Sequence, residues 1–154
     1  MNDDDDGKRI DIEQLIPHRL PMRLVETVAS VDHDSIRTNA VVRDSWPTAQ
    51  GGHARTLMLI ELIAQSAAVL QGWRERHENK AGIGGLLVGI PEAKPQAPSI
   101  PVGTHLACSV RITHGAQNYL AFTGQVVDAD GVLWLTGSIQ AYRPDNLENL
   151  GVSP

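Results

Sequence analysis

Cysteine and aromatic residues are scarce in this chain of 154 residues, and each scarcity excludes a class of protein. Cys108 is the only cysteine, so the chain can form neither an internal disulfide nor a thiolate zinc site. Only 4% of the residues are aromatic and no basic stretch lies among them, so stacking surfaces for nucleic-acid bases are absent. We therefore expect a protein of the reducing cytoplasm, with Cys108 as a buried, unreactive thiol.

Positive charge is also in deficit. The formal net charge is -5 at pH 7, and Asp3 to Asp6 supply four of the negative charges, which leaves the rest close to neutral at about -1. No basic patch indicates a nucleic-acid partner. Because the acidic run is not a cationic start followed by an apolar segment, we expect residues 1–9 to be a disordered acidic tail rather than a signal peptide.

The longest apolar segment runs from Thr56 to Trp73 and contains one acidic residue, Glu61. A helix that is apolar on nearly all sides belongs in the core of a domain. Glu61 and the charged residues after Trp73 argue against a membrane span, so a buried helix is expected. A carboxylate there is costly unless it is paired, hydrogen-bonded or protonated, which makes Glu61 the first candidate for chemistry.

The segments before this helix predict a short helix and a hairpin. Residues 10–16 have helical spacing and end at Pro17. Residues 22–31 and 35–42 are rich in Val, Ile and Thr, which is typical of two strands. Residues 44–52 contain a proline and two glycines and predict a loop leading into the long helix.

The segments after the helix predict about four strands. Residues 83–90 predict a buried strand, and the four prolines in residues 91–101 predict an extended connection outside any sheet interior. The last three strands are expected to form a meander over residues 104–113, 119–127 and 132–142, the last two joined by a turn at Asp128-Ala129-Asp130-Gly131.

This order predicts an α+β fold in which a curved antiparallel sheet wraps around one long central helix, as a single domain over residues 10–147 with a short tail at 148–154. Because the helix is apolar on all sides, something must cover its second face. In a chain of this size the economical cover is another copy, which predicts a homodimer.

Glu61 and Gln65 are four residues apart and share one face of the helix, where they form a narrow polar groove. One interpretation is that Glu61 is a structural carboxylate paired with an arginine such as Arg19 or Arg55. The other is that Glu61 is a carboxyl held in low dielectric that acts as a general acid or base.

Two histidines are candidate partners for Glu61. His53 lies eight positions before Glu61 and follows two glycines, and His18 lies between Pro17 and Pro21, which restrict its loop. Either can also be an ordinary solvated loop histidine. No histidine pair has a metal-ligand spacing and no glycine-rich phosphate loop is present, so we expect neither metal nor cofactor.

The sequence resembles the hot-dog-fold 3-hydroxyacyl-(acyl carrier protein) dehydratases in two segments, Pro17-His18-Arg19-Leu20-Pro21-Met22-Arg23-Leu24-Val25-Glu26 and Leu59-Ile60-Glu61-Leu62-Ile63-Ala64-Gln65-Ser66-Ala67. It is most similar to the branch associated with aryl polyene pathways, because the match extends through Gly72-Trp73 to Ala141-Tyr142-Arg143-Pro144-Asp145. The resemblance implies the hot-dog fold and an assembly that is a homodimer or a dimer of dimers.

The resemblance also implies a reaction. A 3-hydroxyacyl thioester on acyl carrier protein or coenzyme A would lose water to give a trans-2-enoyl thioester, with Glu61 as a buried, protonated acid and His18 or His53 as the base. Gly52-His53-Ala54-Arg55 departs from the Gly-His-Phe-Pro-Gly loop of the family, whereas His18 matches its Pro-His loop.

Further roles follow from the same resemblance. The thioester carbonyl would bind backbone N–H groups at the helix N-terminus, near Arg55, Thr56 and Leu57, and Gln65 would also contact the substrate. An acidic carrier protein would need a basic rim, for which the candidates are Arg19, Arg23, Arg74, Arg76 and Lys80. Two alternatives remain open, a hot-dog acyl thioesterase and a non-catalytic acyl-thioester binding protein.

Overall fold

The computed structural model describes residues 10–79 and 85–144, so the predicted acidic tail and the predicted C-terminal tail lie outside the described residues. The elements in chain order are η3 (Ile12–Gln14), β1 (Thr27–Val31), β2 (Ser35–Val41), β3 (His53–Arg55), η4 (Thr56–Met58), α1 (Leu59–His77), β4 (Leu86–Pro95), β5 (Ser99–Pro101), β6 (His105–Ala116), β7 (Tyr119–Asp128) and β8 (Leu133–Tyr142).

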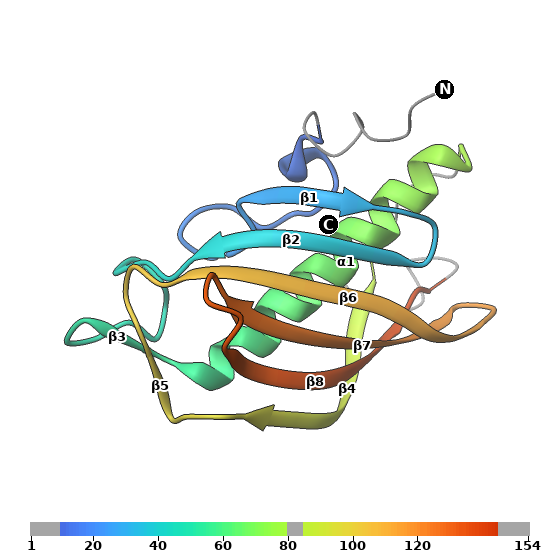
Figure 1. Cartoon of the computed structure of the whole chain (residues 1–154). Helices are drawn as coiled ribbons and strands as arrows, with labels where there is room; N and C mark the ends of the chain where they lie inside the picture. The colour runs from blue at the N-terminus through green and yellow to red at the C-terminus, as the bar shows by residue number, and fades with distance from the viewer. Residues whose placement is uncertain (1–9, 80–84, 145–154) are drawn as a thin grey trace.

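Six strands form one antiparallel sheet in the order β1-β2-β6-β7-β8-β4, and β3 pairs with β5 beside it. The sheet curves around α1, which crosses its concave face (Figure 1). The predicted α+β class, the hairpin before the helix and the meander after it are confirmed. The short helix predicted over residues 10–16 is a single 3-10 turn at Ile12–Gln14.

Two paired glycines allow α1 to lie close to the sheet. Gly124 of β7 and Gly137 of β8 are direct partners across the two strands. A Cβ atom at Gly137 would lie 2.6 Å from Cδ1 of Ile60, and one at Gly124 would lie 3.0 Å from Cγ2 of Ile63. The side chains of α1 can therefore pack directly against these two strands only because both strands lack a side chain at this point.

Residues of the N-terminal segment lie on part of the other face of α1. Ile12, Ile16, Leu24 and Val25 are all buried in the core. At Gly72 a Cβ atom would meet the carbonyl oxygen of Leu15 at 3.0 Å, so this segment lies directly on the helix. A second copy of the chain is therefore not needed to cover this part of α1, and the expectation of a homodimer loses that support.

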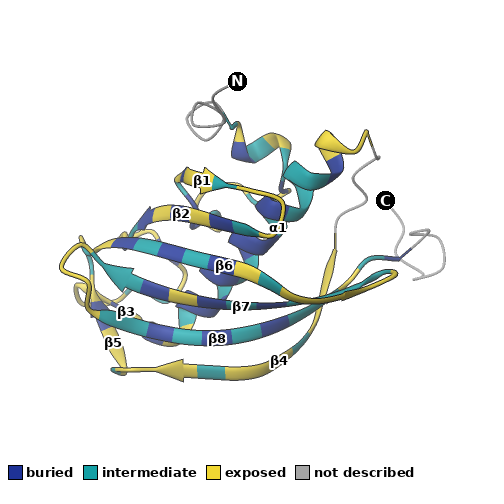
Figure 2. Ribbon diagram, turned by 45° about the vertical axis from the view of Figure 1, so that its right-hand side comes forward, coloured by how far each residue is buried: buried dark blue, intermediate teal, exposed yellow. Residues whose placement is uncertain are grey.

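Strand β4 differs from its prediction. It begins at Leu86 and continues through Pro91 to Pro95, and none of its ten residues is buried. The sheet order places it at an edge, where a proline costs no ladder hydrogen bond on the open side. The strand predicted over residues 83–90 is present from Leu86, with residues 83 and 84 outside the described residues, but its predicted burial is wrong because apolar composition alone does not distinguish an edge strand from a central one. Figure 2 shows β4 as largely exposed.

The segment Thr56–His77 is long and apolar enough to cross a membrane by length and composition alone. In this fold, 56% of its most apolar window is buried inside the domain. Leu59, Leu62, Ile63 and Leu70 are completely enclosed, so this segment is the core helix that its sequence predicts.

Candidate active site

The structure brings His18 to Glu61. Nε2 of His18 lies 3.4 Å from Oε1 of Glu61, and each side chain is 32% exposed. Glu61 lies in the first turn of α1, and His18 lies in the loop that follows η3. Glu61 is therefore half-buried within the chain and not fully buried as expected, which leaves the pair accessible from a cavity.

Gln65 also contacts Oε1 of Glu61. Its amide is 1% exposed, and its Nε2 donates to Oε1 of Glu61 at 2.9 Å and to the carbonyl of Met22 at 2.8 Å. Its Oε1 accepts from the N–H groups of Leu24 at 2.8 Å and Val25 at 3.4 Å. Both donors and both lone pairs of the amide are thus used within the chain. Gln65 has no polar group left for a substrate, contrary to the role expected for it.

These contacts distinguish the two oxygens of Glu61. Oε1 accepts a hydrogen bond from Nε2 of Gln65 and lies 3.4 Å from Nε2 of His18. A proton carried by Glu61 in this arrangement belongs on Oε2. Nδ1 of His18 is buried with no hydrogen-bond partner among the described residues, so Nε2 is the ring nitrogen placed to exchange a proton.

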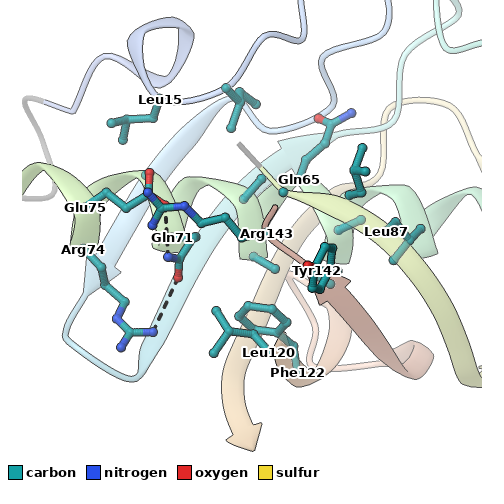
Figure 3. A pocket seen from close by; sticks show the side chains of 18 of the residues that line it. Leu15, Gln65, Gln71, Arg74, Glu75, Leu87, Leu120, Phe122, Tyr142 and Arg143 are labelled. Carbon is teal, nitrogen blue, oxygen red and sulfur yellow. Dashed lines mark hydrogen bonds and ion pairs between the residues drawn. The ribbon is translucent and has the colours of Figure 1, made fainter. Parts of the chain in front are cut away.

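A cavity of about 940 Å³ extends from this pair along α1. The helix contributes a floor of small side chains, Ala64, Ala68 and Gly72, and β7 and β8 contribute Leu120 and Tyr142 to its walls. Figure 3 shows these strand residues, with the polar residues of α1 further along the cavity. The cavity is therefore lined by His18 and Glu61 together with small and apolar side chains, and by further polar side chains along α1.

Comparison with known proteins decides the family. A family model described as ApeP-like, ApeP dehydratase, matches residues 10–151. The chain belongs to the ApeP-like dehydratase family. A comparison with curated proteins finds no match.

Solved structures support the hot-dog fold of this chain. The dehydratase heterocomplex ApeI:P of Xenorhabdus doucetiae aligns with a TM-score of 0.82 and 24% identity, covering 92% of this chain and 96% of that one. A hypothetical thioesterase with coenzyme A from Streptococcus pneumoniae has a TM-score of 0.58 and 12% identity, covering 75% and 82%. The PaaI protein of E. coli has a TM-score of 0.56 and 12% identity, covering 75% and 81%.

The second candidate histidine, His53, lies away from Glu61 in the described structure. His53 is exposed on β3, its Nδ1 is 3.3 Å from the carbonyl of Gly51, and it does not line the cavity that holds Glu61. Within one chain, the structure thus pairs Glu61 with His18.

The backbone donors expected at the helix N-terminus are partly occupied. The N–H of Arg55 donates to Oγ1 of Thr48 at 3.2 Å, and that of Thr56 donates to the carbonyl of Pro98 at 3.2 Å. Leu57 is exposed, and none of Arg55, Thr56 and Leu57 lines the cavity. Two of the three expected carbonyl-binding groups are therefore already used in holding β3 and η4 in place.

The far end of the cavity is charged, which the sequence interpretation missed. Glu75 is 5% exposed in its side chain and lies 2.7 Å from Nη1 of Arg143. Gln71 donates to Glu75 at 3.1 Å, and Arg74 contacts Gln71 at 3.5 Å (Figure 3). The sequence contains a signal for this group, because Gln71 and Glu75 are four residues apart and Glu75 lies near the helix face that carries Glu61. Nothing in the sequence places Arg143, which follows β8, beside them.

Most of the arginines expected to form a basic rim already contact other residues of this chain. Arg23 and Arg19 lie 2.8 Å and 3.5 Å from carboxylate oxygens of Glu13. Arg76 donates to Oε1 of Gln14 at 3.1 Å, and Lys80 lies outside the described residues. Among the described residues, no group of three or more His, Cys, Asp and Glu side chains is arranged to hold a metal ion.

Proposed function

We propose that this dehydratase removes water from a 3-hydroxyacyl thioester to give a trans-2-enoyl thioester, with His18 and Glu61 as its acid–base pair. The observation that carries the proposal is the 3.4 Å separation of Nε2 of His18 from Oε1 of Glu61 at one end of the cavity. Family membership supports dehydration, and the pair supplies the two groups that dehydration requires.

The proton transfers balance with these two residues alone. Nε2 of His18 takes the proton from C2, the electron pair of that bond forms the C2–C3 double bond, and the C3–O bond breaks. Glu61 gives the proton on Oε2 to the departing hydroxyl, which leaves as water. The two groups are close together, as they must be to act on substituents of neighbouring carbons. The elimination leaves an imidazolium at His18 beside a carboxylate at Glu61, and return of the proton from Nε2 to a carboxylate oxygen of Glu61 restores a neutral imidazole and a protonated carboxyl group.

The cavity suits a long thioester substrate. Glu61 and Glu75 are 14 residues apart on α1, which corresponds to about 21 Å along the helix axis. Small side chains on the helix leave this length open to an acyl chain. We propose that the thioester is carried by an acyl carrier protein or coenzyme A, and that the reaction takes place in the cytoplasm.

A thioesterase is the alternative that a specific observation favours, because a hypothetical thioesterase is among the proteins with the same fold. In that reaction, Glu61 would activate water against the thioester carbon, and free thiol would appear. Incubation with a 3-hydroxyacyl thioester separates the two functions. The dehydratase proposal expects an enoyl thioester and no thiol, whereas thiol without an enoyl product contradicts it. Tight binding with no product would instead indicate a non-catalytic binding protein.

We also propose that the chain forms a homodimer, or a dimer of dimers, through the open edge of β4. Leu86, Leu87, Val88 and Ile90 are 43–55% exposed on this edge strand. An open, apolar strand edge is prone to pair with another chain. Val88→Lys should shift the native mass measured by light scattering from dimer to monomer, and an unchanged dimer would contradict this assignment.

A further inference from the structure

The guanidinium of Arg19 binds the backbone of its own loop. Nη1 of Arg19 donates to the carbonyls of Ile16 and His18, both at 2.9 Å, and Nη2 donates to the carbonyl of Glu13 at 3.0 Å. Nε of Arg19 also lies 3.5 Å from Oε2 of Glu13. One side chain thus joins the end of η3 to the peptide group of His18 itself.

This contact pattern is specific to arginine. A planar guanidinium presents five N–H donors in a fixed geometry, and three of the contacts here are carbonyl oxygens that face the same fork. Lysine has the same charge but concentrates its donors on one atom, so it cannot reach all three carbonyls together. If Arg19 served only as a positive charge on the surface, this backbone arrangement would be unnecessary.

Gln65 binds the other end of the same loop. Its amide contacts the carbonyl of Met22 and the N–H groups of Leu24 and Val25, just after Pro21. The same Nε2 group donates to Glu61. The loop that carries His18 is therefore fastened to η3 by Arg19 before the turn and to α1 by Gln65 after it.

We propose that Arg19 and Gln65 are positioning residues that hold the loop so that His18 faces Glu61. This inference rests on the proposed function for its effect on rate. In this proposal, Arg19 positions the loop that carries the acid–base histidine, instead of contacting a carrier protein as expected from the sequence. The hydrogen bonds of Gln65 are buried, and those of Arg19 are charge-assisted contacts made by a side chain that is 54% exposed.

The decisive variant is Arg19→Lys, which keeps the charge and leaves the buried core intact. Its matched control is Arg37→Lys, the same change at an exposed position on β2. Rates are measured with two forms of one 3-hydroxyacyl thioester, carried by coenzyme A and by an acyl carrier protein. We expect Arg19→Lys to lower kcat by roughly tenfold to a hundredfold with both forms at little change in KM, because misplacement by about 1 Å has effects of that size. A rise in KM for the carrier-linked form alone, or an unchanged kcat, would overturn the proposal.

A second comparison shows whether Arg19 acts through His18. In a chain that already carries His18→Ala, adding Arg19→Lys should not lower the residual rate further, because no imidazole remains to be positioned. If Arg19→Lys lowers the rate in the His18→Ala chain by as large a factor as it does in the wild-type chain, the proposal is overturned. Gln65→Met should lower kcat at least as much as Arg19→Lys. It should also lower the melting temperature, because the buried backbone groups that Gln65 contacts would lose their hydrogen-bond partner.

An activity-independent measurement separates this inference from the proposed reaction. NMR spectra of the Glu61→Gln variant should show the imidazole signals of His18 shifted from their positions in the wild-type protein. The same substitution in an Arg19→Lys background should produce a smaller shift, because the ring no longer faces the carboxylate. If His18→Ala retains the full rate while this loss of coupling is seen, the reaction scheme fails and the positioning role stands. If the coupling is unchanged by Arg19→Lys, the positioning role fails.

Discussion

Nε2 of His18 lies 3.4 Å from Oε1 of Glu61, although the two residues are 43 positions apart in the chain. One lies in a loop before the first strand and the other lies in the first turn of the core helix. The short distance exists because the N-terminal segment packs onto α1, with Ile16 and Leu24 buried on either side of His18. The same packing that completes the core therefore assembles the candidate acid–base pair.

His18→Ala and Glu61→Gln should each lower kcat for dehydration by roughly 10²–10⁴-fold, because each removes one proton-transfer group. Both side chains are about one-third exposed, so their loss should change the melting temperature little. Steady-state rates and thermal melting of the same preparations test this together. Normal activity in the His18→Ala variant would show that another group is the base.

His53→Ala should keep its rate within about twofold of wild type, because His53 is an exposed residue of β3 outside the cavity and surface changes have small effects. The same dehydration assay measures it. If the rate falls as far as in His18→Ala, then His53 reaches Glu61 from a second chain, and the base has been assigned to the wrong histidine.

Gly137→Ala should destabilise the fold by about 1–3 kcal/mol, the usual cost of overpacking a core. Its new Cβ would lie 2.6 Å from Ile60 and 3.1 Å from the carbonyl of Glu92, a backbone atom that cannot rotate away. Gly85→Ala is the control, since the nearest atom there is 3.8 Å away. Urea unfolding of the two variants measures the difference, and equal midpoints would show that α1 has room to move from the sheet.

Cys108 should not react with iodoacetamide in the native protein at pH 8. Burial raises the pKa of its thiol to about 12, so almost none of the reactive thiolate is present at that pH. Unfolding in guanidinium chloride should restore an ordinary thiol pKa and rapid labelling, which mass spectrometry detects. Labelling of the folded protein at the rate of a free thiol would show that the strand carrying Cys108 opens.

Asp128→Asn should destabilise the fold more at neutral than at acidic pH. Hydrogen bonds from the indole of Trp134 and from the N–H groups of Val132 and Asp130 lower the pKa of Asp128. The ionised carboxylate therefore favours the folded state above about pH 4, and this contribution is lost as the pH falls through the lowered pKa. The melting temperatures of wild type and variant should converge at pH values below the pKa of Asp128. A difference independent of pH would show that the charge of Asp128 does not matter.

Much of the fold could be predicted because its signals are local. The segment around Glu61 is apolar over five turns, and the Asp128–Gly131 turn between alternating strands identifies its hairpin. Strand β4 was mispredicted because its apolar residues and Pro91 suggest a buried segment and a loop, whereas its edge position follows from long-range pairing with β8.

The candidate site was only partly predictable for a related reason. Residue type and local spacing single out Glu61 and His18, but they do not indicate which histidine lies near the helix. The family resemblance implies a substrate contact for Gln65, which shares a helix face with Glu61. Its contacts with Met22 and Leu24 depend on how the N-terminal segment folds back, which no local pattern in the sequence encodes.

The most direct test of the central claim is the mass of a carrier protein loaded with a 3-hydroxyacyl group after incubation with this protein. The wild-type protein should remove one molecule of water with the thioester intact, and Glu61→Gln should convert only a trace in the same time. Release of the acyl group without an enoyl product, or equal conversion by Glu61→Gln, would contradict dehydration by His18 and Glu61.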